Sequence, residues 1–235
     1  MHGTMALPTA HSLARIELFK NLDREALRHL EDSCSWVNVA AKEWVLDHQG
    51  DGTDLFFVLR GHLQVVVSVA GRDTILRDIR TGEYFGELAA LDRQPRSAGI
   101  VAVTTATLAR MPAPVFRRAI QEHNAVCDRV IAVLVRQIRS LTDRANETTG
   151  LKMKYRLIAE LLRMANPEQP GVGETILSPP PTHADLAARV ASHRETVTKE
   201  LGVLERAGLI GRRPGAIVLL APGRLRRMVA DASKG

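Results

Sequence analysis

The 235-residue sequence predicts an α+β chain built from a β-rich region, a long helix and a small helical domain with a hairpin. Three observations support this order. Short apolar runs separated by glycine-containing turns extend from Trp36 to Leu108 and are typical of strands. Apolar residues then recur every three or four positions from about Val115 to Glu147, which indicates a helix. After residue 181, two short helical patterns precede a hairpin pattern.

The N-terminal region is expected to begin with short helices over residues 13–32, where leucines and Phe19 recur at helical spacing. The strands that follow are predicted at residues 55–59, 63–69, 74–79 and 100–108. Many short strands at this spacing indicate a sandwich or a barrel-like roll. Pro112 and Pro114 are expected to end the β region.

One apolar set in the long helix alternates by four and three residues, as the a and d positions of a coiled coil do. Its members are Cys127, Ile131, Leu134, Ile138, Leu141 and Ala145. A helix packed only on its own domain would also have one apolar side. A second apolar face at Val126, Val130 and Val133 favours a helix that packs on the roll and also on a second copy. The pattern therefore predicts a homodimer through residues 127–145.

The segment 146–151 contains Thr-Thr-Gly and is expected to be a hinge between domains of residues 1–146 and 147–235, with the dimerisation helix at about 115–146. An amphipathic helix is predicted over residues 152–164. The stretch 166–181 is rich in Pro and Gly and predicts a loop.

The last part of the chain has the pattern of a winged helix-turn-helix. Thr182 is placed to cap a first helix, and Asp185 lies three residues later. A second helix is predicted from Arg194 to Ala207, and Gly208 ends it. The positions that pack the two helices are apolar: Leu186, Ala187, Val190, Val197, Leu201 and Leu204. Residues 209–220 predict a hairpin whose tip carries Arg212 and Arg213.

The formal net charge of +6 is confined to this last part. Residues 151–235 hold 14 Lys and Arg against 8 Asp and Glu, whereas residues 1–150 hold 18 of each kind. Such asymmetry is typical of a neutral domain joined to one that binds a polyanion, although a solvated basic surface has the same count.

Three charged residues near the start of the second helix are suited to reading base edges. Arg194 can donate two bonds to guanine, Glu195 can accept from cytosine, and Lys199 can donate to guanine. A salt bridge between Glu195 and Lys199, four residues apart, is the simpler explanation on any exposed helix. Their place on the second helix of this motif favours base contacts.

The run from Gly82 to Ala98 carries a second type of chemistry. Glu87 can accept hydrogen bonds from sugar hydroxyls, while Arg96 and the backbone amides at Gly86 can hold a phosphate. The run therefore suits a nucleotide whose ribose and phosphate are bound together. A buried ion pair between Glu87 and Arg96 in a ligand-free roll is the alternative.

Two motifs in the sequence resemble those of one known family. The run FGELAALDRQPRSA at residues 85–98 resembles the phosphate-binding cassette of cyclic-nucleotide-binding domains. The run SHRETV at residues 192–197 resembles the recognition helix of the cyclic-AMP receptor protein and fumarate-nitrate regulator (CRP/FNR) family. The resemblance implies a bacterial transcription regulator with a cyclic-nucleotide-binding β-roll, a dimerisation helix and a winged helix-turn-helix that binds a palindromic DNA operator. It also implies a cytoplasmic protein that contacts RNA polymerase and is not an enzyme.

The resemblance assigns ligand roles to individual residues. Glu87 would bind the ribose 2′-hydroxyl, and Arg96 and Ser97 would bind the cyclic phosphate. Gly86 and Leu88 would shape the cassette.

At the base end, Leu76 matches an apolar wall position and Arg77 stands where the family's cyclic-AMP receptor has a small polar residue. Leu141 and Thr142 align with a Thr-Ser pair that reaches the base, and Thr142 keeps one hydroxyl, presented across the dimer. Cyclic AMP is the first expectation and cyclic GMP the second.

At the DNA end, the resemblance places Thr182 and Thr196 at phosphate-contacting positions, and His193 replaces a serine with that role. Lys199 replaces an arginine and cannot make its planar two-pronged contact. Ala191 occupies a turn position where glycine is common, and a positive φ there would cost about 1 kcal/mol.

Other classes of protein are disfavoured. Two cysteines cannot form a disulfide framework or a thiolate metal site, and they suit a reducing cytosol. The N-terminal cysteine cluster of iron–sulfur sensors is missing, and eight scattered histidines do not predict haem. We expect no signal peptide, no membrane span, no metal and no catalytic residues. Two rivals stay open: a constitutive DNA-binding protein whose roll is vestigial or takes another effector, and a regulatory subunit of an enzyme or channel.

Overall fold

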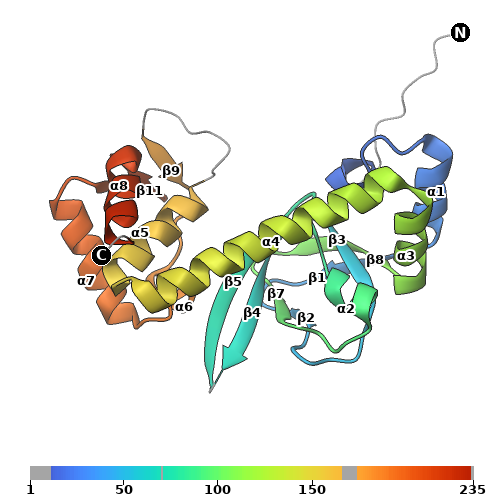
Figure 1. Cartoon of the computed structure of the whole chain (residues 1–235), viewed down its shortest axis with the longest axis horizontal. Coiled ribbons are helices and arrows are strands. Elements are labelled where there is room, and N and C mark those ends of the chain that lie inside the picture. Colours follow the sequence, from blue (N-terminus) through green and yellow to red (C-terminus); the bar gives the residue numbers. More distant parts are fainter. Residues whose placement is uncertain (1–11, 70, 166–173, 234–235) are drawn as a thin grey trace, which may run out of the picture. The chain divides into compact units, whose positions relative to one another are not determined.

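The computed structural model describes residues 12–69, 71–165 and 174–233. The chain divides into two compact units, Met1–Arg136 and Gln137–Gly235, which are described separately below. The division falls inside the long helix α4 (Asn124–Gly150). Figure 1 shows the elements of both units along the chain. Among the described residues, no helix combines the length and the apolar composition that crossing a bilayer would need.

The first unit contains a roll of two antiparallel four-stranded sheets, as the sequence predicts (Figure 1). One sheet has the order β1-β8-β3-β6, with bounds Ser35–Val39, Ala106–Met111, Leu55–Arg60 and Tyr84–Phe85. The other has the order β2-β7-β4-β5, with bounds Trp44–Leu46, Gly99–Ala102, His62–Val69 and Arg72–Arg80. Residues 55–59 of β3 are all buried, because this strand lies inside its sheet and is covered on both faces.

The predicted strand at residues 100–108 is in fact two strands in different sheets. The turn at Val103–Thr105 separates β7 from β8, and backbone bonds from Val103 and Thr104 to the carbonyl of His62 hold it. Two of the three turn residues are Thr104 and Thr105, and the alanines on either side of the turn, Ala102 and Ala106, enter the same core. Threonine is common in strands, so the sequence pattern did not mark the turn.

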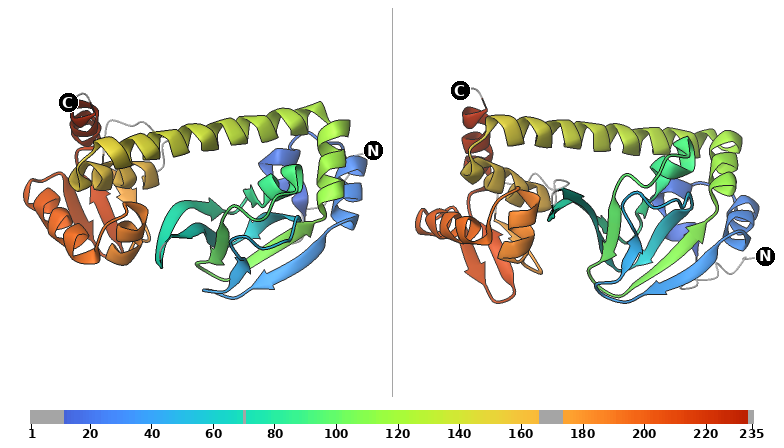
Figure 2. Two further views of the ribbon diagram at one scale, coloured as in Figure 1. Left: turned by 60° about the horizontal axis from the view of Figure 1, so that its bottom comes forward. Right: turned by 90° about the horizontal axis from the view of Figure 1, so that it is seen from below.

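Helices cover one end of the roll (Figure 2). They comprise the short turns Leu13–Arg15 and Glu17–Phe19, α1 (Arg24–Asp32), α3 (Ala113–Glu122) and the start of α4. Their apolar residues share one core with the sheet, including Phe57, Phe116, Val126 and Val130. The burial of Val126 and Val130 confirms the predicted second apolar face of the long helix.

The single helix predicted from about residue 115 is wrong. His123 has an extended backbone (φ −127°, ψ 96°), and it ends α3 before α4 begins at Asn124. The apolar spacing continues through the break because both helices bury residues in the same core.

The second unit has the predicted helix-turn-helix and a larger wing. Its helices are α5 (Met153–Met164), α6 (His183–Arg189), α7 (Arg194–Arg206) and α8 (Pro222–Ala232). The wing strands β10 (Ile210–Arg213) and β11 (Ala216–Leu219) are joined by a third, β9 (Thr175–Leu177). The predicted loop 166–181 therefore contains a strand, and its residues 166–173 lie outside the described part of the chain. All six apolar residues predicted to pack the two helices are buried.

Candidate ligand site and DNA interface

Arg96 is buried between two loops of the roll, with 4% of the residue exposed. Its Nη1 donates to the carbonyl of Gly86 at 3.1 Å, and its Nη2 donates to the carbonyl of Asp54 at 2.8 Å. Its Nε has no hydrogen-bond partner among the described residues. The two carbonyls thus fix the orientation of the guanidinium, and its buried Nε is left as a donor without a partner in this part of the structure.

Gly86 lies against this guanidinium, where a larger residue would collide with it. A Cβ at Gly86 would lie 2.7 Å from Nη1 of Arg96 and 2.9 Å from the Asp54 carbonyl. Gly86 also has a φ of +87°, which favours glycine. It begins α2 (Glu87–Asp92), so part of the stretch expected as one loop is a short helix.

The charges around Arg96 partly compensate its burial. Burial lowers the pKa of Arg96, while the carboxylates of Asp54 and Glu87 oppose that shift. Glu87 is itself only 5% exposed. The carboxylate of Asp54 also accepts from Nε of Arg110 at 2.6 Å. Leu88 and Ser97 are exposed beside the loop.

Two of the residues expected at the base end, Leu76 and Arg77, are also in the first unit. Leu76 is the extra residue of a β-bulge, because Val65 pairs with Arg77 and Val66 with Ile75. Arg77 forms an ion pair with Glu83 at 3.2 Å and donates to the carbonyl of Tyr84 at 3.4 Å.

Tyr84 is a polar group that the sequence reasoning missed. Its hydroxyl is buried and has no hydrogen-bond partner among the described residues. Burial raises the pKa of Tyr84, and the carboxylate of Glu87 raises it further. The only signal in the sequence was a phenol at a position where an apolar residue would fill the core equally well.

Leu141 and Thr142 belong to the second unit, so the structure gathers only the other predicted ligand residues. The Thr142 hydroxyl donates to the carbonyl of Ile138 at 3.0 Å, within its own helix. Leu141 is 49% exposed.

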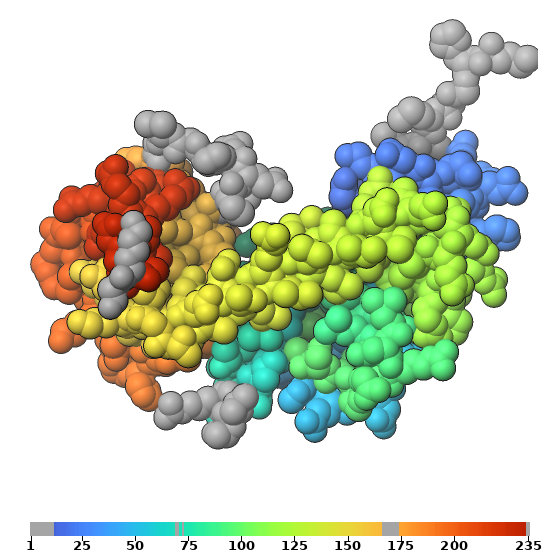
Figure 3. Space-filling view, in the orientation of Figure 1, coloured from blue at the N-terminus to red at the C-terminus, as the bar shows by residue number. Residues whose placement is uncertain are grey.

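One side of α4 lies on the surface in Figure 3, and four apolar residues of this helix form an exposed stripe. Ile131, Val135, Ile138 and Leu141 are each 44–63% exposed at spacings of four, three and three residues. Leu134, which the heptad pattern placed in this stripe, instead packs against the core of the first unit. The exposed stripe therefore contains Val135 in place of Leu134, which the coiled-coil pattern had predicted.

The helix-turn-helix begins with the predicted cap. The Thr182 hydroxyl accepts from the Asp185 amide at 3.0 Å, and the Asp185 carboxylate accepts from the Thr182 amide at 3.1 Å. Ala191, in the turn, has a φ of +48°, so the conformation that favours glycine is present there.

The residues expected to contact DNA lie on the surface of the second unit. His193 precedes α7, and Arg194, Glu195, Thr196 and Lys199 are exposed on its first turns. Within residues 174–233, no salt bridge joins Glu195 to Lys199. The base-reading role of these residues stays a prediction.

The two wing arginines are paired with carboxylates. Nε of Arg212 lies 3.4 Å from Glu205, and Arg213 pairs with Glu174. All four side chains are 40–58% exposed, so these pairs are weak and open to exchange for phosphate. No three His, Cys, Asp or Glu side chains of the described residues form a group that could hold a metal ion.

Two family models match successive parts of the chain. A cyclic nucleotide-binding domain matches residues 36–123, and a Crp-like helix-turn-helix domain matches residues 155–228. The chain belongs to the CRP/FNR family of transcription regulators. This CRP/FNR regulator thus joins a sensor domain of the cyclic-nucleotide-binding type to a DNA-binding domain of the Crp type. The CRP/FNR family consists of transcription regulators and not of enzymes.

Known relatives agree with this assignment. The cAMP-activated global transcriptional regulator CRP of Escherichia coli O6:H1 is 26% identical over 177 residues, which is 74% of this regulator and 84% of that protein. A CRP/FNR-family regulator from Thermus thermophilus has a similar structure, with a TM-score of 0.63 and 28% identity over 83% of this chain and 98% of that one.

Fungal lysophospholipases also match part of the regulator. The lysophospholipase nte1 of Aspergillus oryzae is 31% identical over 119 residues, or half of this chain. The match spans only 8% of that protein, so this chain covers less than a tenth of its length.

Proposed function

We propose that this CRP/FNR regulator is a cytoplasmic homodimer that binds a cyclic nucleotide in its roll and a palindromic DNA operator through α7. The observation that carries the proposal is the buried Arg96, held by the carbonyls of Gly86 and Asp54 beside the buried Glu87. A buried cation with a free donor next to a carboxylate suits a ligand that joins an anion to a sugar hydroxyl.

We assign the ligand contacts by the family resemblance, and the burial of Arg96 and Glu87 supports them. Arg96 and Ser97 bind the cyclic phosphate, and Glu87 accepts from the ribose 2′-hydroxyl. Gly86 and Leu88 shape the loop. Bonds from Arg96 to a phosphate are charge-assisted and stronger than bonds to neutral carbonyls, so a ligand can compete for this guanidinium.

The base is contacted by a different set of residues. Leu76 packs against it, Arg77 lies at its edge, and Thr142 reaches it across the dimer. Cyclic AMP is our first choice and cyclic GMP our second. Nucleotide binding shifts the population towards the form whose two α7 helices fit adjacent major grooves, about 34 Å apart.

The output surfaces suit a dimeric DNA-binding protein. The exposed stripe at Ile131, Val135, Ile138 and Leu141 packs against its copy in a second chain. Arg194, Glu195 and Lys199 read bases, while His193, Thr196 and the wing arginines contact phosphates, with Thr182 beside them. RNA polymerase is the expected partner at the promoter.

A second candidate is a regulator of this family whose roll is ligand-free or takes another effector. Two observations favour it. Two donors of Arg96 are already satisfied without a ligand, and the Thr142 hydroxyl is bonded to its own helix while Leu141 offers none. A cyclic nucleotide must displace some of these bonds.

Calorimetric titration of the full chain with cyclic AMP and cyclic GMP separates the two candidates. We expect one nucleotide to bind and to change the affinity for operator DNA, measured by fluorescence anisotropy at two salt concentrations. No heat with either nucleotide and no change in DNA affinity would favour the second candidate. DNA binding that does not weaken as salt rises would contradict both.

A further inference from the structure

A buried charge cluster connects three helices of the second unit. Its centre is Glu160 on α5, which is 1% exposed. Arg144 of α4 lies 3.0 Å from the Glu160 carboxylate, Arg189 of α6 lies 3.3 Å from it, and Arg163 of α5 also contacts it. Arg163 in turn donates to both carboxylate oxygens of Glu147, on α4, at 2.7 and 2.9 Å. We call these five residues the Glu160 cluster.

This arrangement is costly to disturb. A buried carboxylate needs compensating partners, because burying an isolated charge is strongly unfavourable. Removing one partner of a buried pair leaves the other charge uncompensated. Apolar residues of similar size would often stabilise the protein equally well at these positions. Charged partners also restrict the direction and register of the helices that carry them.

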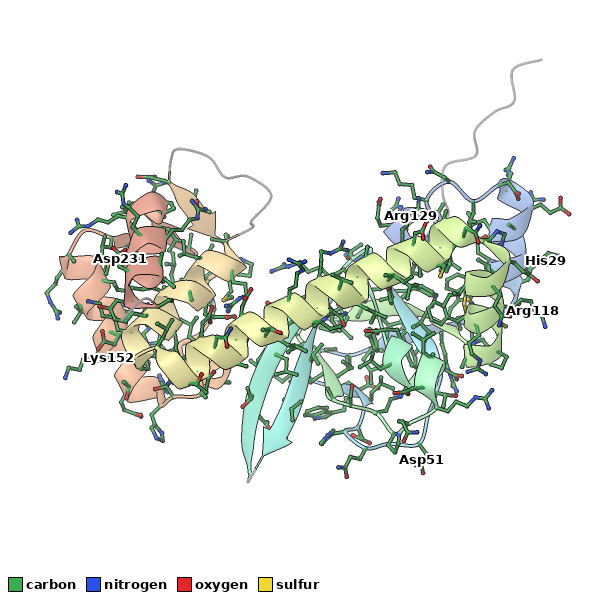
Figure 4. All side chains as sticks on the ribbon, viewed as in Figure 1. His29, Asp51, Arg118, Arg129, Lys152 and Asp231 are labelled. Atoms are coloured by element: carbon green, nitrogen blue, oxygen red, sulfur yellow. The ribbon has the colours of Figure 1, made fainter. Side chains whose placement is uncertain are left out.

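The cluster spans the place where a hinge was expected. Asn146 to Gly150 are the last residues of α4, Leu151 is buried, and Met153 already begins α5. Lys152, labelled in Figure 4, marks the turn between the two helices. Nη1 of Arg156 in α5 donates back to the carbonyl of Thr148 at 3.4 Å. Contacts therefore cross the turn from both sides.

The same cluster reaches the recognition helix in one further step. Arg189 ends α6, and α6 packs on α7 through Leu186, Val190 and Val197 in a shared core. A change in the direction of the end of α4 is thus passed by Glu160 and Arg189 to α6, and by that core to Arg194.

We propose that the Glu160 cluster makes the last two turns of α4 one rigid body with the helix-turn-helix. Arg144, Glu147, Glu160 and Arg189 are positioning residues for DNA recognition, and the pivot of the switch lies N-terminal to Arg144 rather than at residues 146–151. The part of this proposal that concerns the switch rests on the proposed function.

Amide hydrogen exchange on the full chain without nucleotide tests the rigid body directly. We expect residues 146–151 to be protected as well as the middle of α5. Arg144→Met and Glu147→Gln should each speed exchange there by about tenfold, because local opening no longer breaks the ion pairs. Arg139→Met and Asp143→Asn, at exposed positions of the same helix, are the matched controls. Faster exchange at 146–151 than in α5 of the unmodified chain, or no response to either variant, would overturn the rigid body.

Operator affinity with and without nucleotide tests the positioning role. In Arg144→Met and Glu147→Gln, the ratio of the two affinities should fall by about fivefold or more, while nucleotide affinity measured by calorimetry stays unchanged. An equal loss of DNA affinity in both conditions would mean that the cluster only supports the fold, which contradicts the proposal. If the unmodified chain responds to neither cyclic nucleotide, the proposed function fails, and the exchange experiment still decides the rigid body.

Discussion

Buried arginines occur in both units of this regulator, and their partners differ. Arg96 in the roll makes its two side-chain hydrogen bonds to neutral carbonyls. Arg144, Arg163 and Arg189 in the second unit each form an ion pair with the carboxylate of Glu160. A buried arginine held by carbonyls keeps most of its attraction for an anion, whereas one paired with a carboxylate has already used it. The first arrangement suits ligand binding, and the second suits fixed geometry.

The largest effect should come from Glu160→Gln, which removes the charge but keeps the shape. Three arginines would then share a buried space with one fewer carboxylate, and we expect a loss of about 3 kcal/mol in the free energy of unfolding. Urea denaturation measures it. Glu174→Gln, which breaks an exposed pair with Arg213, should cost less than about 1 kcal/mol. Equal losses of unfolding free energy in Glu160→Gln and Glu174→Gln would mean that the buried and the exposed ion pairs contribute equally to stability.

Next in size is the effect of Arg96→Met on ligand binding. The loss of charge-assisted bonds to phosphate should cost about 2–3 kcal/mol, or roughly 30- to 150-fold in nucleotide affinity by calorimetry. The free energy of unfolding should fall less than in Glu160→Gln. Arg96→Met removes one cation from beside Asp54 and Glu87, whereas Glu160→Gln leaves three arginines with one fewer carboxylate. Arg118→Met, at an exposed position of α3 labelled in Figure 4, is the control. Unchanged nucleotide affinity in Arg96→Met would contradict the ligand role.

Arg194→Ala should weaken specific operator binding by about 2 kcal/mol and relax the preference at one base pair of each half-site. Competition binding with a set of single-base operator variants measures this. Arg118→Ala should leave the preference unchanged. If Arg194→Ala weakens all sequences equally, Arg194 contacts phosphate rather than a base.

The smallest expected effect is that of Gly86→Ala. The positive φ and the contacts with Arg96 and the Asp54 carbonyl predict a cost of about 1–2 kcal/mol in stability and a weaker nucleotide complex. Gly223→Ala is a suitable control, because a Cβ there meets nothing within 4 Å. Thermal unfolding should show a lower stability for Gly86→Ala than for Gly223→Ala, and calorimetry should show weaker nucleotide binding. Equal stability and equal nucleotide affinity in the two variants would mean that the backbone at Gly86 is not constrained.

Local patterns predicted the elements whose signals are short-range. The Thr182–Asp185 capping box and the roll of short strands are both present. The predictions that failed depended on distant contacts. The run 100–108 splits between two sheets, His123 interrupts the long helix, and Leu134 turns into the core while Val135 is exposed. Periodicity reports that a residue is apolar, but it does not report which neighbouring surface covers it.

The sequence by itself determined the chemistry of this regulator: a Glu-Arg cassette, a basic C-terminal third and a capped helix-turn-helix motif. These features depend only on residue types and on short spacings along the chain, so the sequence alone reveals them. Only the tertiary structure decided which charges are paired. The local composition does not distinguish Arg96 from Arg189. Arg96 donates to a backbone carbonyl, whereas Arg189 donates to the carboxylate of Glu160, 29 residues away in the chain. Partners so distant in sequence are chosen by packing, which no local pattern records.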